Sequence, residues 1–105
     1  MITAQLSRRR RSYRVFLSGH ADYEPGNDIV CAAVSALVWA WLTYACSRRV
    51  RWRERVLEKG RARLVCRGGA RLRPAFASLA LGLEQIARQY PRHLRFASPV
   101  TDKEG

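Results

Sequence analysis

Residues 29–45 form an apolar run without a charged side chain, and this run limits what the chain can fold into. A helix of this length would be apolar on every side, so it has to be covered by other protein or by lipid. The run is close to the minimum length for crossing a bilayer. It is rich in alanine, however, and alanine contributes little to membrane insertion. We therefore predict a buried helix packed against a sheet, in a protein that does not enter the membrane.

Shorter patterns flank this helix on both sides. Several stretches alternate apolar and polar residues, as strands with one buried face do. Pro74 and an apolar stripe every three to four residues indicate a second helix. Residues 50–57 fit a strand, although a helix over 51–59 fits them too. The predicted strands are 1–6, 13–17, 50–57, 61–66 and 93–96, the predicted helices are 28–45 and 74–89, and 98–105 is a predicted disordered tail.

Together these elements predict one domain over residues 1–105, a length typical of a single folding unit. The fold class is α+β. A small mixed β-sheet packs with two helices, and the elements follow in the order β-β-α-β-β-α-β.

Charge is distributed unevenly along the chain. The chain contains 20 lysines and arginines against 8 acidic residues, for a formal net charge of +12. Most of the basic residues are arginines, which suit phosphate binding. The arginines of 8–11, in a predicted turn, and of 48–55 are either solvated surface or contacts with ribosomal RNA. In contrast, residues 18–46 contain no lysine or arginine. Their only charged residues are Asp22, Glu24 and Asp28, an acidic island that favours a cationic partner.

A histidine and a cysteine lie at the two ends of a short loop before the apolar helix. Asn27 or Asp28 is the expected N-cap, and an N-cap at Asp28 puts Cys31 at the third helical position. The partial positive charge at a helix N-terminus favours the thiolate, which is the nucleophilic form of cysteine. His20 can act as the base that takes the thiol proton. The alternative is that Cys31 is a small buried hydrophobic residue.

The motif around these two residues resembles a known family. Gly19-His20-Ala21, then Gly26, then DIVCAAVSAL at 28–37 resemble the signature of the ribosomal-processing cysteine proteases. A weaker similarity lies within 82–91. The resemblance implies a cytoplasmic, homodimeric cysteine endopeptidase without a cofactor. It also implies the substrate, the cationic N-terminal extension of ribosomal large-subunit protein twenty-seven, which is removed during ribosome maturation.

The resemblance assigns the chemistry to Cys31 as nucleophile and His20 as general base. Asp28 either orients His20 or only caps the helix. Ser35, one turn after Cys31, forms a hydrogen bond near the thiol or back to its own helix.

The remaining predicted site residues shape the loop or contact the substrate. Gly19 permits a backbone conformation that other residues avoid. Gly26 shapes the loop rather than contacting substrate. Asp22 and Glu24 are the predicted contacts for the basic substrate arm.

The other cysteines are assigned structural roles. Cys46, Cys66 and His93 lack the spacing of a metal site, so no metal is expected. An odd number of cysteines is not a disulfide framework, and reduced thiols fit a cytosolic protein.

Two further interpretations stay open. Trp39, Trp41 and Tyr44 are predicted to form an aromatic cluster, which packs in the core or a dimer or receives substrate aromatic residues. The alternative function is a non-catalytic RNA-binding or ribosome-assembly module that uses the arginine-rich face.

Overall fold

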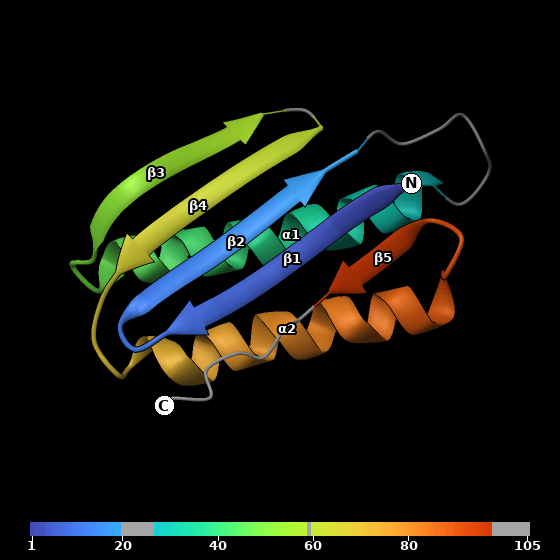
Figure 1. Cartoon of the computed structure of the whole chain (residues 1–105). Coiled ribbons are helices and arrows are strands. Elements are labelled where there is room, and N and C mark those ends of the chain that lie inside the picture. The colour runs from blue at the N-terminus through green and yellow to red at the C-terminus, as the bar shows by residue number, and fades with distance from the viewer. Residues whose placement is uncertain (20–26, 59, 98–105) are drawn as a thin grey trace.

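The computed structural model describes residues 1–19, 27–58 and 60–97 (Figure 1). Its elements are β1 (Ile2–Arg9), β2 (Ser12–Ser18), α1 (Asn27–Ser47), β3 (Arg51–Glu58), β4 (Arg61–Arg67), α2 (Leu72–Gln89) and β5 (Leu94–Ala97). This order confirms the predicted α+β fold. The predicted disordered tail, 98–105, lies outside the described residues.

The five strands form one mixed sheet in the order β3-β4-β2-β1-β5. The pairs β1–β2, β2–β4 and β3–β4 are antiparallel, whereas β5 adds to β1 in parallel. Both helices lie on the same side of this sheet (Figure 1). Among the described residues, no helix covers the opposite side, which we call the open face.

The core lies between the sheet and the helices. Alternate residues of each inner strand point into it, and Leu6, Val15 and Leu64 are at most 1% exposed. This alternation is what a sheet with one buried face requires. An aromatic group made of Tyr13, Trp41 and Phe76 lies in the same core, with ring centroids 5.1 to 5.7 Å apart.

The predicted cluster of Trp39, Trp41 and Tyr44 is therefore wrong in its membership. Successive helical residues point about 100° apart. Trp41 points into the core, whereas Trp39 is 56% exposed. Tyr44 is half-buried and its hydroxyl donates a hydrogen bond to the carbonyl of Arg71 at 3.3 Å.

Helix α1 is covered on some of its sides only. Its inner side, including Val30, Val34 and Val38, is at most 4% exposed. Its neighbour α2 lies alongside, and a Cβ on Gly82 would come within 2.8 Å of the Leu37 side chain. Residues Ile29–Ser47 are long and apolar enough to cross a membrane, and 28% of the residues in that apolar window are buried. The outer side of α1 is thus apolar and exposed.

Several boundaries differ from the predictions. Strand β1 continues to Arg9, so the basic turn shrinks to Arg10 and Arg11, because Arg9 still pairs with Ser12. Arg10 has a φ of 55°, in the left-handed region that a tight turn requires. Residues Arg51–Glu58 are a strand, which decides between the two interpretations of that segment. Helix α2 begins at Leu72, two residues before Pro74.

Candidate active site

The candidate site is at the end of the sheet where β2 stops. Gly19 has a φ of +124°, which residues with side chains rarely adopt. A Cβ there would collide with the backbone oxygen of Met1 and lie 3.0 Å from the Cα of Ile2. The Gly19 N–H also donates a hydrogen bond to the Gly60 carbonyl at 3.1 Å. Glycine is therefore required here, and its contacts fix the point from which the chain continues to His20.

Helix α1 begins at the same end of the molecule (Figure 1). Val30 is 1% exposed and belongs to the core, so it anchors the first turn of the helix. Cys31 follows directly and is a free, half-buried thiol. A nucleophilic cysteine has to be held rigidly and still be reachable, and this position meets both conditions.

The helix start differs from the predicted one. Both Asn27 and Asp28 lie inside α1, so neither is the N-cap and Cys31 is the fifth helical residue rather than the third. The unpaired N–H groups belong to the first turn, and the field of the helix weakens beyond it. Cys31 therefore lies further from the unpaired N–H groups of the helix end than the sequence suggested. A base acting on the thiol becomes correspondingly more important.

Ser35 lies one turn after Cys31 and is exposed. Within the described part of the chain, its hydroxyl has no hydrogen-bond partner. The role of Ser35 near Cys31 therefore stays a prediction, and its exposed hydroxyl can be reached by a bound peptide.

Other predicted site residues fall outside the described part of the chain. These are His20, Asp22, Glu24 and Gly26. Asp28 is placed in α1, but its side chain is not described. The pairing of Cys31 with a histidine therefore stays a prediction that rests on the sequence.

The two remaining thiols have contrasting surroundings. Cys66 is 1% exposed, and burial, with a smaller contribution from nearby Cys46, raises its pKa to about 11. A thiol with such a pKa stays protonated and unreactive near neutral pH. Cys46 is exposed, and the Arg55 guanidinium lies 3.7 Å from its sulfur. Nothing in the sequence indicates this contact, because Arg55 is on β3 and reaches Cys46 of α1 only in the folded protein. Within residues 1–19, 27–58 and 60–97, no group of three potential metal ligands is found.

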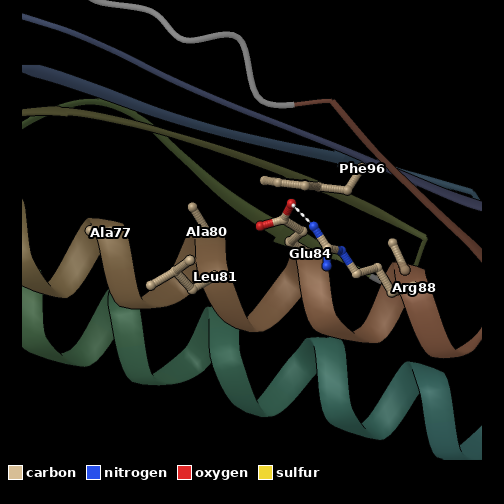
Figure 2. Close-up of a pocket in the computed structure, with 7 residues that line it drawn as sticks. Ala77, Ala80, Leu81, Glu84, Arg88 and Phe96 are labelled. Atoms are coloured by element: carbon tan, nitrogen blue, oxygen red, sulfur yellow. Dashed lines mark hydrogen bonds and ion pairs between the residues drawn. The ribbon is translucent and has the colours of Figure 1, made fainter.

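A pocket of about 760 Å³ lies between α2 and β5, and Cys31 is not among the residues that line it (Figure 2). Glu84 and Arg88, one helical turn apart, form an ion pair at 3.1 Å beside it. The lining residues are Ala77, Ala80, Leu81, Glu84, Ala87, Arg88 and Phe96. None of them was predicted as a site residue, and none carries a nucleophile. In the sequence, the one indication of this pocket is Leu81, a large apolar residue among the alanines that line it. Leu81 is exposed in the structure.

Comparison with known proteins decides the family. The sequence profile described as cysteine protease Prp matches residues 1–95, which include Cys31 and the preceding loop. The chain belongs to the cysteine protease Prp family. As a Prp family member it is a cysteine endopeptidase.

Individual relatives agree with this assignment. The ribosomal processing cysteine protease Prp of Mycoplasma genitalium is 30% identical over 77 residues, covering 72% of this chain and 78% of that protein. The crystal structure of Prp from S. aureus with a substrate peptide superposes with a TM-score of 0.74 at 21% identity, covering 94% and 100% of the two chains. SMU.848 from Streptococcus mutans gives a TM-score of 0.73 at 25% identity, covering 97% and 96%. The Prp fold thus extends over almost the whole chain.

Proposed function

We propose that this Prp family member removes the N-terminal extension of ribosomal large-subunit protein twenty-seven during ribosome maturation in the cytoplasm. The observation that carries the proposal is Cys31, a half-buried free thiol near the start of α1 within the segment that matches the family. The Mycoplasma genitalium relative is named a ribosomal processing protease, and S. aureus Prp has been crystallised with a substrate peptide. Both descriptions support a ribosomal-protein substrate for this chain.

In the proposed reaction, His20 removes the proton from the Cys31 thiol. The thiolate attacks the carbonyl carbon of the scissile peptide bond, and N–H groups at the start of α1 are placed to stabilise the oxyanion. His20 then gives its proton to the leaving amine, so a thioester forms as the C–N bond breaks. Water, deprotonated by the same histidine, hydrolyses the thioester and restores the thiol.

Supporting roles follow from position in the chain. Gly19 fixes the end of β2, from which the chain continues to His20. Asp28, in the first turn of α1, would orient the histidine. Gly26 would shape the loop, and Ser35, exposed one turn beyond Cys31, would contact the bound peptide.

The charge of this segment supports a cationic substrate. Residues 18–46 contain no lysine or arginine, although the chain as a whole has a formal charge of +12. Asp22 and Glu24 would bind the basic arm by attraction between opposite charges. Such exposed contacts weaken as salt is added.

Cleavage of an extended ribosomal-protein peptide, followed by mass spectrometry, tests the proposal. Cys31→Ser and His20→Ala should both lose turnover while keeping the circular dichroism spectrum of the parent, because a serine hydroxyl is much less acidic than a thiol. Cys46→Ser is the matched control, since it removes a thiol from the same helix, and it should cleave normally. Normal cleavage by folded Cys31→Ser would rule out the proposed nucleophile.

We further propose that the protein is a homodimer that pairs through the outer side of α1. Ile29 and Trp39 on this helix are 61% and 56% exposed. Pairing would remove their apolar surface from water. Sedimentation over a range of concentrations should show a dimer, and Trp39→Ala should weaken it. Leu81→Ala is the control, because Leu81 is also 61% exposed but lies on α2. Equal weakening by both variants would count against pairing through α1.

Contact with ribosomal RNA is a proposal about another surface. The arginines predicted to make it occur in 8–11 and 48–55, and several belong to strands. Those on the open face of the sheet lie on the side opposite the helices, so RNA contact does not compete with the proposed dimer.

A further inference from the structure

The pairing of the strands gathers arginines that are far apart in the sequence onto the open face. Residues paired across neighbouring strands share a face of the sheet. In each strand, the residues that alternate with the core-facing residues therefore have their side chains on the open face. Six arginines there are exposed, namely Arg9, Arg14, Arg51, Arg61, Arg67 and Arg95. Each of the five strands contributes one of them and β4 contributes two, so the positive charge spans the whole sheet.

The arginines are not balanced by acidic residues. Among the residues that the structure describes, the carboxylates on this face are Glu54 and Glu58, both on β3. Glu54 is already bound by Arg63 through two hydrogen bonds of 3.0 and 3.1 Å. In the described part of the chain, none of the six arginines forms an ion pair with a carboxylate.

One row of the sheet places like charges directly beside each other. Arg51 pairs with Arg67 across β3 and β4, and the next two positions in the same row are Ser12 and Arg9. Strands are about 4.8 Å apart, so three guanidinium groups originate within roughly 15 Å. Like charges directly opposite one another destabilise a sheet. An anion bound along this row would remove that repulsion.

The centre of the open face holds a guanidinium group in a fixed position. The Arg63 guanidinium carbon lies 4.3 Å from the centre of the Phe16 ring, on the middle strand of the sheet. The two hydrogen bonds that the Arg63 guanidinium donates to the Glu54 carboxylate hold this stack in place. A planar guanidinium supported in this way offers a flat surface on which an unpaired base can stack.

From this placement we propose that the open face binds the phosphate backbone of RNA. Arginine matches phosphate geometry with two parallel hydrogen bonds. The charged surface is about 20 Å wide and equally long, estimated from strand spacing and rise, which accommodates several successive phosphates. A second copy of the chain carries the same positive charge on this face and would be repelled. An anionic membrane lacks bases to stack on the central guanidinium.

The row of Arg9, Arg51 and Arg67 lies beside Ser12 at the start of β2, whereas Gly19 follows the other end of that strand, so RNA on this row and a peptide can bind together. That use of the surface, holding a protease beside a ribosomal substrate, rests on the proposed function. RNA binding itself does not, and it is measured without any peptide.

The test uses a charge-matched pair of triple variants and a fluorescent single-stranded RNA. The first variant, Arg9→Gln with Arg51→Gln and Arg67→Gln, removes the like-charged row. The control, Arg71→Gln with Arg88→Gln and Arg92→Gln, removes the same charge from exposed positions in α2 or close to its ends. Binding is followed by fluorescence anisotropy over a series of salt concentrations. The melting temperature of each variant, which the row variant should keep or raise, confirms that it is folded.

The parent should bind RNA with an affinity that falls steeply as salt rises. The row variant should bind roughly tenfold more weakly, and its slope of log affinity against log salt should be shallower by about 2, the value for three lost phosphate contacts on a single strand. The control should stay close to the parent. Equal weakening in both variants would overturn the proposal, because total charge would then explain binding. Binding of phosphatidylserine vesicles but not RNA, or loss of the dimer only in the row variant, would assign the face to a membrane or to a second copy.

Discussion

Gly19 connects the stability of the fold to the geometry of the candidate site. Its φ of +124° and the Met1 oxygen leave no room for a side chain. In Gly19→Ala, the unfavourable backbone conformation costs about 1–3 kcal/mol. The new methyl group would also push the start of β1 away, which endangers the 2.9 Å hydrogen bond from the Ile2 N–H to the His93 carbonyl. Losing that bond adds about 1 kcal/mol. We expect a total loss near 3 kcal/mol and a fall in melting temperature of at least about 10 °C.

Gly69→Ala is the matched control for this experiment. A Cβ on Gly69 would meet nothing within 4 Å. Its effect should lie within about 0.5 kcal/mol of zero or be slightly stabilising, since alanine restricts the unfolded chain. Urea unfolding of both variants gives the free energies, and peptide cleavage is measured at a temperature where both are folded. The folded fraction of Gly19→Ala should also cleave more slowly, because the chain continues to His20 from this point. Equal stability of the two variants would refute the reasoning from the positive φ and the Met1 contact.

Two further predictions concern the core. Trp41→Ala should lower the free energy of unfolding by about 3–5 kcal/mol, because it removes one of three packed aromatic rings, whereas Trp39→Ala should change the stability of the monomer little. Denaturant titration at a protein concentration that gives monomers compares them, and similar losses would contradict the assigned orientations. The second prediction follows from the pKa of Cys66, which burial raises from 9.0 to about 11. Since the folded state holds this proton more tightly than the unfolded state, its contribution is complete below pH 9 and is lost as the pH rises towards 11, by up to about 2–3 kcal/mol. Unfolding measured across this range should show a smaller decline in Cys66→Ala, and an unchanged decline would assign the effect to other groups such as Tyr13, whose pKa is also raised by burial.

The sequence predicts strands best where one face of the strand is buried and the other is exposed to solvent. The predicted boundaries of β2 and β4 are within one residue of the observed ones, because their inward residues alternate with arginines and serines. Strand β3 was ambiguous because none of its residues is fully buried and a bulge between Trp52 and Glu54 interrupts its register. The extension of β1 through Arg8 and Arg9 was missed, since consecutive arginines look like a turn until a partner strand pairs with them.

The uniform apolarity of α1 had a similar consequence. It predicted the helix but not which side would be buried, so the orientations of Trp39 and Trp41 could not be told apart. For the site, the motif gave the position of Cys31, while the start of the helix depended on a choice among several possible caps. The sequence drew attention to the arginines of 8–11 and 48–55 but not to their arrangement, because only strand pairing brings Arg9 and Arg51 into one row with Arg67.

The parallel pairing of β5 with β1 also bears on how the protein forms as it is synthesised. Residues 2–5 pair with residues 94–97, so this contact closes a loop of nearly the whole described chain. Contacts so distant in sequence form late, because the entropy of closing the loop is lost before the contact is gained. A nascent chain that has emerged only as far as α2 exposes β1 as an unpaired edge next to a hydrophobic core, a surface prone to association with other chains. Synthesis of the last strand therefore both completes the sheet and removes this edge.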